Sequence, residues 1–332
     1  MRAIVRYQGL PPSDPRSLVE ARVPAPVTAG RDVLVRVEAV SVTSVDVRAR
    51  THRLPTPEGL ILGGEGSGTV VAVGPDVTRF KAGDRVWWVG EVNRPGSNAD
   101  YQLVDERNVG LKPVTLSWAE AAAMPMTAIT AWEALFDRLH LTGTSTGTIL
   151  MVGASGGVGS IMIQLARTLL PLVRTIATAS SDQEAAWVSA LGTDAIVDSR
   201  LGLVEQVDNA APDGIDWIFT PHARGLSDAN ATVLKPFGNE RARRRRGTPG
   251  VAPQVTARVA WHWELMFTRP LERIPDGVAR QDVLDKVAAL VDAGRLRTTM
   301  ATHLTGFDAR TLRTAHALVE KGPAIGKVVV AR

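Results

Sequence analysis

The chain of 332 residues contains no cysteine, which excludes disulfide bonds, thiolate catalysis and cysteine-ligated zinc. None of its six histidines stands at a paired metal-ligand spacing, so the sequence predicts no metal site. No apolar run approaches the roughly 20 residues that cross a bilayer. Residues 1–6 place charges within an apolar run, which indicates a first β-strand and not a signal peptide. We therefore expect a cytoplasmic protein without a membrane partner.

The chain also has few aromatic residues and a small net charge. Phe, Trp and Tyr make up 5% of the chain, and the formal net charge is +4. The segment Glu240–Arg246 holds five arginines and one glutamate, so it accounts for that whole net charge. The remaining surface is balanced, and we do not expect nucleic-acid binding from the overall charge.

The most informative segment is a glycine-rich turn between an apolar strand, residues 148–152, and an apolar-periodic helix, residues 158–170. Ala154, Gly156 and Gly159 match the G/A-x-G-x-x-G spacing of a dinucleotide-binding loop. The first position allows a tight turn, the second lets the backbone approach a pyrophosphate, and the third lets helix and strand pack closely. The helix N-terminus offers N–H groups to phosphates. The flanking strand and helix favour a nucleotide site, whereas a lone match would not.

The chain falls into a β-rich part and an alternating part. Gly and Pro separate short apolar runs that predict strands at 32–40, 69–73, 84–89 and 101–104. Ser117 and Glu120 form an S-x-x-E pattern, which predicts a capping box at the start of a helix. After the glycine loop, we expect strands at 173–179, 195–198 and 214–219, and helices at 182–191 and 226–234. Strands that alternate with helices predict a parallel sheet. The last expected elements are helices at 280–293 and 310–321 and a strand at 327–331.

Further motifs run through almost the whole chain: GEGSG at 64–68, VG at 73–74, FKAGDRV at 80–86, AAAMPMTAITAWEAL at 121–135, WHWELMFTRP at 261–270, AH at 315–316 and GKV at 326–328. Together with the glycine loop they resemble the medium-chain dehydrogenase/reductase superfamily, in its zinc-free quinone-oxidoreductase-like branch. Members of that branch are often labelled zinc-type alcohol dehydrogenase-like. The resemblance implies an α/β protein with a GroES-like β-rich catalytic domain and a Rossmann cofactor domain with a doubly wound parallel sheet. The implied boundaries are 1–121 and 265–332 for the catalytic domain and 122–264 for the NADP-binding domain.

The zinc label does not suit this chain. By resemblance, Thr43, Gly64 and Met126 stand where zinc-bearing relatives place the catalytic Cys, His and Cys. Glycine has no donor atom, and a thioether or a lone hydroxyl is a poor ligand for Zn²⁺. The four-cysteine structural lobe is missing as well. We therefore expect a metal-free enzyme.

The end of the second Rossmann strand bears on the choice of cofactor. NAD enzymes place Asp or Glu there to accept from the ribose 2′-OH, whereas this strand ends in Ser180 and Ser181. The interpretation is that no carboxylate repels a 2′-phosphate, while Asp182 serves as a helix-cap residue. Arg200, after the third strand, supplies the charge that the phosphate favours, or else is a solvated loop arginine. The sequence favours NADPH.

The resemblance also implies individual cofactor contacts. Thr130 should approach the nicotinamide ribose, and Thr220 and His222 should border the crevice that holds the dinucleotide. Lys327 should approach the phosphates, although an ordinary strand-end charge is the alternative. The backbone contacts implied for the pyrophosphate and the carboxamide are at Ala154, Ser155, Gly156, Gly157, Val158, Met266, Phe267 and Thr268.

A site without a metal can still pass a hydride to an acceptor that is already electrophilic, such as a quinone or an α,β-unsaturated carbonyl. Hydrogen-bond donors would stabilise the developing oxygen charge, and Thr43, Arg50 and Asn93 are the candidates. Each of them is also open to interpretation as a loop residue without a catalytic role. The leading hypothesis is an NADPH-dependent reductase. The alternatives are a low-turnover nucleotide-binding protein whose arginine cluster contacts RNA, and a zinc alcohol dehydrogenase, which the missing ligands disfavour.

Residues 239–250 depart from the family pattern, because five arginines replace an apolar strand. A basic loop and a sequence altered by compensating reading-frame errors both explain the segment. Further on, Val259, Trp261, Trp263 and Leu265 alternate with polar residues. In relatives this strand pairs across a two-fold axis, so we expect a homodimer that covers the two tryptophans.

Overall fold

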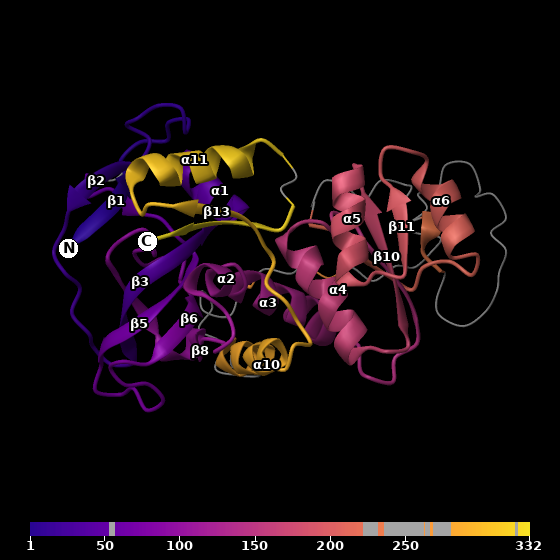
Figure 1. Cartoon of the computed structure of the whole chain (residues 1–332), viewed down its shortest axis with the longest axis horizontal. Helices are drawn as coiled ribbons and strands as arrows, with labels where there is room; N and C mark the ends of the chain where they lie inside the picture. The colour runs from indigo at the N-terminus through magenta and orange to yellow at the C-terminus, as the bar shows by residue number, and fades with distance from the viewer. Residues whose placement is uncertain (53–56, 222–231, 236–261, 263–265, 268–279, 323–324) are drawn as a thin grey trace. The chain divides into compact units, whose positions relative to one another are not determined.

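The computed structural model describes residues 1–52, 57–221, 232–235, 262, 266–267, 280–322 and 325–332. The chain divides into two compact units. Unit 1 comprises Met1–Thr130 and Leu265–Arg332, and unit 2 comprises Ala131–Glu264 (Figure 1). None of the helices in the described ranges is long and apolar enough to cross a membrane.

Unit 1 contains a seven-stranded sheet to which both ends of the chain contribute. Its strands are β3 (Asp32–Val42), β5 (Glu65–Val73), β6 (Arg85–Val89), β7 (Tyr101–Asp105), β8 (Val109–Leu111), β13 (Met300–Thr305) and β14 (Lys327–Ala331). The order is β13-β14-β3-β5-β6-β8, and β7 also pairs with β3. A smaller sheet has the order β2-β1-β4, with the bounds Val19–Arg22, Arg2–Arg6 and Leu60–Ile61. Because β14 pairs with β3, the last strand of the chain joins the sheet formed by the first hundred residues.

The glycines of the GEGSG motif let β5 lie against its neighbours. A Cβ at Gly66 would stand 2.8 Å from Cζ2 of Trp88, and a Cβ at Gly68 would stand 2.0 Å from the carbonyl oxygen of Arg36. Side chains alternate across a strand, so Glu65 points to the opposite face, where it is fully buried. The glycines therefore leave room for Trp88 and for the neighbouring strand on one face of β5, and Glu65 places a buried carboxylate on the other face.

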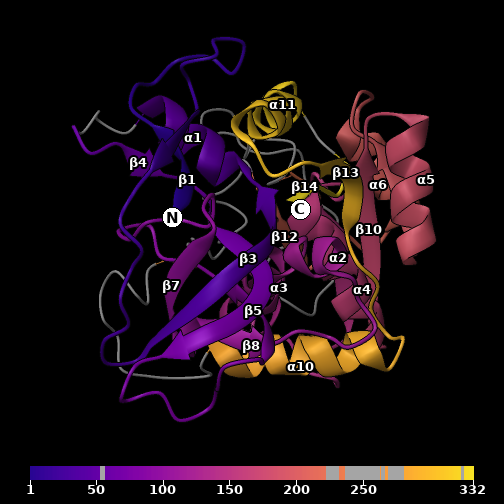
Figure 2. The ribbon, with the colours of Figure 1, turned by 60° about the vertical axis from the view of Figure 1, so that its left-hand side comes forward.

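The helices of unit 1 flank this sheet. They are α1 (Ser44–His52), η1 (Glu106–Asn108), α2 (Trp118–Ala122), α3 (Pro125–Trp132), which continues two residues into unit 2, α10 (Arg280–Asp292) and α11 (Ala309–Glu320). The predicted capping box at the start of α2 is confirmed: the Ser117 hydroxyl accepts from the Glu120 N–H at 3.2 Å, and the Glu120 carboxylate accepts from the Ser117 N–H at 2.9 Å. Helix α10 lies along β8, and α11 lies beside α1 (Figure 2).

Unit 2 has the predicted parallel sheet, in the order β11-β10-β9-β12. Its strands are β9 (Gly147–Met151), β10 (Val173–Ala179), β11 (Ala195–Asp198) and β12 (Trp217–Phe219), and its helices are η2 (Glu133–Arg138), α4 (Gly157–Leu169), α5 (Asp182–Leu191) and α6 (Leu203–Ala210). Since the first strand, β9, is central, the strand order reverses beside it. In doubly wound sheets such a reversal marks the ligand crevice at the carboxyl ends of the strands.

Several expectations fall outside the described residues. They are most of the helix expected at 226–234, the arginine cluster at 240–246 and most of the strand at 259–265 with its two tryptophans. The two interpretations of residues 239–250 therefore stay open, and the homodimer stays a prediction.

His316, on α11, is a fully buried titratable residue. The Arg50 Nε–H donates to His316 Nδ1 at 3.4 Å, and the same guanidinium pairs with Glu320 and with the Leu10 carbonyl. Burial, with the nearby Arg50 charge second, lowers the pKa of His316 to about 3. The imidazole is therefore neutral in the folded protein at physiological pH.

Lowering the pH from 7 to 5 should reduce the free energy of unfolding by about 2 kcal/mol through His316 alone. The unfolded chain takes up a proton below the ordinary pKa of 6.5, whereas the folded chain, with a pKa of about 3, does not. Stability therefore falls as the pH drops below 6.5, and the loss ends near pH 3. Urea denaturation at both pH values measures it. His316→Gln should flatten the dependence, whereas His303→Gln, at an exposed position on β13, should keep it; an identical pH dependence in both variants would contradict the assignment.

Candidate functional site

The glycine loop of unit 2 leads directly into the N-terminus of α4. Gly156 is the N-cap residue, with φ −70° and ψ 173°, and no side chain caps the helix. The first N–H groups of a helix have no partner within the helix itself, so this end of a 13-residue helix is a suitable site for an anion. Ser160 anchors the turn, since its hydroxyl donates to the Ser155 carbonyl at 3.2 Å.

The packing of the loop explains the spacing of its small residues. A Cβ at Gly159 would stand 2.5 Å from Cα of Ala154, so α4 can approach the loop this closely only with glycine there. Gly153 has a φ of 65°, and its N–H donates to Oγ1 of Thr178 on β10 at 3.0 Å. The residues present fit a dinucleotide pyrophosphate, because the turn is tight, the helix end is uncapped and the loop is fastened to the sheet.

The end of β10 differs from the sequence interpretation. Glu184, on α5, turns its carboxylate back so that Oε2 accepts from the Ser180 N–H at 2.6 Å and from the Ser180 hydroxyl at 2.8 Å. The expectation that no carboxylate lies at this strand end is therefore wrong, because a helix residue supplies one. The pattern S-x-x-E at Ser181–Glu184 could have predicted this position of the Glu184 carboxylate, because the same pattern predicted the cap at Ser117.

Arg200 lies after β11 and is paired within its own turn. Its guanidinium donates to both oxygens of Asp198, at 2.5 Å from Nη2 and 2.9 Å from Nε. The hydrogen bond from Arg200 lowers the pKa of Asp198 to about 2. Both groups are accessible to solvent, so the pair is weak, and a phosphate could compete for Arg200.

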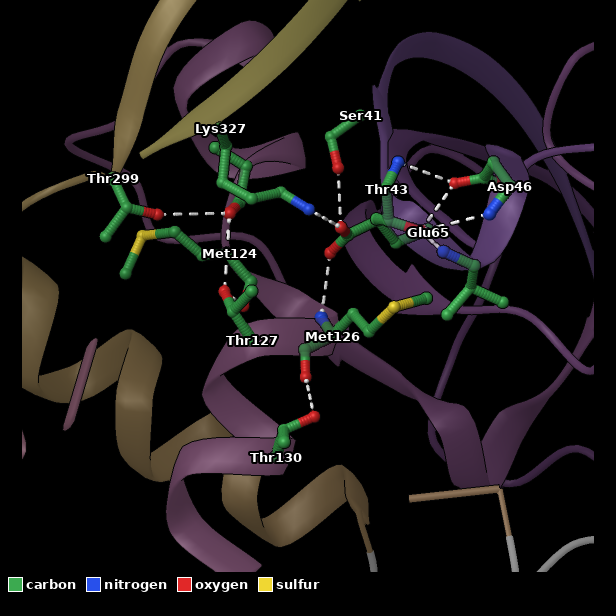
Figure 3. A network of polar contacts seen from close by, with 12 residues as sticks. Ser41, Thr43, Asp46, Glu65, Met124, Met126, Thr127, Thr130, Thr299 and Lys327 are labelled. Atoms are coloured by element: carbon green, nitrogen blue, oxygen red, sulfur yellow. Dashed lines mark hydrogen bonds and ion pairs between the residues drawn. The ribbon is translucent and has the colours of Figure 1, made fainter. Parts of the chain in front are cut away.

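Unit 1 contains a buried polar network at the start of β5 (Figure 3). Lys327 Nζ donates to Glu65 Oε1 at 2.6 Å, and the Ser41 hydroxyl donates to the same oxygen at 2.5 Å. The Met126 N–H, at the start of α3, donates to Glu65 Oε2 at 2.8 Å. The carboxylate is fully buried and the lysine is 6% exposed, so their charges compensate each other in the interior.

Thr43 and Asp46 form a second buried cluster beside this network (Figure 3). Asp46 Oδ2 accepts from the Thr43 N–H at 2.8 Å and from the Thr43 hydroxyl at 2.7 Å, while Oδ1 accepts from the Gly63 N–H at 3.1 Å. Burial raises the pKa of Asp46, and the hydrogen bonds from Thr43 oppose the rise. The cluster therefore places a buried carboxyl group in direct hydrogen-bond contact with the Thr43 hydroxyl.

The residues at the positions where zinc-bearing relatives ligate the metal do not fit a catalytic zinc. A Cβ at Gly64 would stand 2.6 Å from the Met126 methyl group and 3.9 Å from Asp46 Oδ1, so Gly64 and Met126 are neighbours but bring no strong donor. The nearby Glu65 carboxylate is already paired with the Lys327 ammonium. In the described ranges no three His, Asp or Glu side chains converge as metal ligands.

The structure places the other predicted residues as follows. Thr130 and Met266 are brought together, since the Thr130 hydroxyl lies 3.5 Å from Met266 Sδ and 2.8 Å from the Met126 carbonyl. Met266 and Phe267 are buried, and Thr220 is half-buried after β12. His222 and Thr268 lie outside the described residues.

Two of the three predicted hydrogen-bond donors, Arg50 and Asn93, do not belong to the buried cluster of Thr43 and Asp46. Arg50 is fully buried on α1 and not in a loop, and its guanidinium is engaged by His316, Glu320 and the Leu10 carbonyl. Asn93 lies exposed in the turn after β6. Thr43 alone belongs to the buried cluster. Sequence reasoning missed Ser41, Glu65 and Asp46, although Glu65 stands within the GEGSG motif and Asp46 lies three residues after Thr43.

A GroES-like sheet and a parallel sheet with a glycine loop define the class of nicotinamide-dependent dehydrogenases and reductases. The model of the alcohol dehydrogenase GroES-like domain matches residues 29–132, and that of the zinc-binding dehydrogenase domain matches residues 191–330. A zinc-type alcohol dehydrogenase-like protein of Staphylococcus aureus strain Mu50 is 33% identical over 317 residues, which are 94% of this chain and 93% of that protein. The chain therefore belongs to the medium-chain dehydrogenase/reductase superfamily, and it is an oxidoreductase of that family.

Other similar proteins span several activities. The crystal structure of a Rhizobium etli protein, described as a proposed zinc-dependent alcohol dehydrogenase, is 40% identical with a TM-score of 0.91 and covers 100% of this chain and 98% of its own. A 2-methylene-furan-3-one reductase of tomato is 32% identical over 67% of this chain and 57% of its own length. The quinone oxidoreductase of Escherichia coli, complexed with NADPH, shares the fold with a TM-score of 0.80 over 100% of both chains, at 18% identity.

Proposed function

We propose that this protein is an NADPH-dependent reductase that transfers a hydride to a quinone or an α,β-unsaturated carbonyl without zinc. The observation that carries the proposal is the set of residues at the family's metal position. Gly64 and Met126 have no strong donor, and Lys327 balances the buried Glu65 carboxylate. Without a Lewis acid, an alcohol is not activated, so the acceptor must be electrophilic by itself.

The roles that we propose for individual residues rest on the family resemblance and on the contacts described above. The reduced nicotinamide supplies the hydride when it is bound. The glycine loop and the α4 N-terminus hold the pyrophosphate, and Thr130 contacts the nicotinamide ribose. Thr43 donates a hydrogen bond to the acceptor oxygen. When Asp46 is protonated, its carboxyl O–H donates the hydrogen bond to the Thr43 oxygen. The Thr43 hydroxyl hydrogen is then free to donate to the substrate oxygen.

The similar proteins support the acceptor class. The tomato relative is a 2-methylene-furan-3-one reductase, and the compound in its name is a conjugated enone. An NAD(P)H oxidoreductase of mouse mitochondria, 28% identical over 90% of this chain, supports a nicotinamide cofactor. We also propose a cytoplasmic homodimer.

Stopped-flow oxidation of NADPH tests the proposal directly. We expect turnover with quinones and enones and at least tenfold slower turnover with saturated aldehydes, because only the first two classes delocalise the incoming charge. The same assay with NADH should give weaker apparent binding than with NADPH. Faster reduction of saturated aldehydes than of enones would contradict the acceptor class.

The purified protein is expected to contain no stoichiometric zinc, because the positions that would ligate it offer no adequate donor set. Elemental analysis measures the content, and activity after dialysis against a chelator measures the requirement. A zinc-containing alcohol dehydrogenase treated in parallel serves as the control and should lose activity. One zinc per chain, or activity lost on chelation and restored by zinc, would overturn this part of the proposal.

A further inference from the structure

The carboxyl edge of the unit 2 sheet gathers several charges around the end of β10. Ala179 pairs with Asp198 in the register of β10 and β11, so the residues after both strands are neighbours. Asp182 and Glu184 belong to the first turn of α5, and Arg200 follows Asp198. Three carboxylates and one guanidinium therefore surround the place where the adenine-side ribose of a dinucleotide lies in this fold class.

Glu184 is the carboxylate nearest to the strand end. One of its oxygens, Oε2, takes both hydrogen bonds from Ser180, and the residue is 7% exposed. In the part of the chain that the structure describes, no hydrogen bond reaches its other oxygen, Oε1. A buried carboxylate with an unused acceptor oxygen is the group that a ribose 2′-hydroxyl needs as a partner.

Resting on the proposed function, we propose that Glu184 sets the choice between NADH and NADPH. It stands in for the acidic residue that ends this strand in NAD enzymes, but it comes from the following helix. Its Oε1 accepts from a ribose 2′-hydroxyl, and its charge repels a 2′-phosphate. Arg200 acts in the opposite direction and attracts that phosphate when it leaves Asp198. Glu184 thereby limits the NADPH preference and keeps NADH competitive.

The Glu184→Gln variant separates charge from structure. The glutamine carbonyl can still accept from the Ser180 N–H, so the start of α5 keeps its contact while the negative charge is lost. Asp182→Asn is the matched control, because it removes a charge from the same helical turn at an exposed position without a contact to Ser180. Thermal denaturation of both variants shows whether the fold is retained.

Fluorescence titration of the full chain with NADPH and with NADH gives the ratio of the two dissociation constants. We expect Glu184→Gln to shift this ratio at least tenfold toward NADPH, and Asp182→Asn to shift it less than threefold. Glu184→Ala, which removes cap and charge together, should shift the ratio in the same direction even if its melting temperature falls.

Three results would overturn the proposal. The first is a shift below threefold in Glu184→Gln. The second is an equal shift in Asp182→Asn, which would indicate an effect of overall charge. The third is an equal loss of affinity for both cofactors, which would leave Glu184 a helix cap alone. Wild-type protein that binds neither dinucleotide would instead refute the proposed function and this inference with it, so the two failures are distinguishable.

Discussion

Replacing Lys327 with methionine is expected to lower the free energy of unfolding by about 3–5 kcal/mol. The variant removes the only charge that balances Glu65 among its hydrogen-bonding partners in the described residues, and leaves a fully buried carboxylate with the Ser41 hydroxyl and the Met126 N–H. An unpaired buried charge costs far more than the pair contributes, because the desolvation of the carboxylate is no longer offset. Urea denaturation of the purified variant measures the loss.

The double variant Glu65→Gln/Lys327→Met is the control for this interpretation. It removes both charges and keeps an amide that can hydrogen-bond to Ser41 and Met126, so it should recover more than half of the stability lost in Lys327→Met. Arg36→Met on the exposed face of β3 controls for the loss of a surface cation and should change stability by less than about 1 kcal/mol. A double variant as unstable as Lys327→Met would show that Lys327 acts through packing and not through its charge.

The second large effect is expected at the glycine loop. Gly159→Ala should reduce stability by about 1–3 kcal/mol and weaken cofactor binding at least tenfold. The added Cβ would stand 2.5 Å from Cα and 2.7 Å from O of Ala154, which are backbone atoms that cannot rotate away. Helix α4 must then move off the loop, and its N-terminus no longer meets the pyrophosphate. Thermal denaturation and fluorescence titration with NADPH measure the two effects.

Gly156→Ala gives the matched comparison three residues earlier. Its backbone, with φ −70°, suits alanine, and the new Cβ would meet only the Gly153 carbonyl oxygen at 3.4 Å. Stability should therefore stay within about 0.5 kcal/mol of the wild type. Cofactor affinity should still fall at least tenfold, because the methyl group stands where the backbone approaches the pyrophosphate. Unchanged NADPH affinity in Gly156→Ala would place the dinucleotide elsewhere.

The sequence by itself determined the architecture of each unit. The strand, glycine loop and helix at 148–170 predicted a Rossmann sheet, because period and punctuation are local properties of the chain. The parallel sheet of unit 2, the cap at Ser117 and the membership in the dehydrogenase/reductase superfamily are confirmed. The same local logic could have found Glu184, since Ser181–Glu184 repeats the capping pattern.

Only the tertiary structure decided which side chains meet. Glu65 and Lys327 are 262 residues apart in sequence, and they form an ion pair because β14 joins the sheet beside β3. Arg50 was a plausible donor by position, but α11 packs against its helix and engages its guanidinium with Glu320. The Glu184 carboxylate lies at the end of β10 because the side chain turns back past the N-cap of its own helix. A periodic pattern fixes which face of an element is apolar, whereas partners far apart in sequence are chosen by sheet pairing and helix packing.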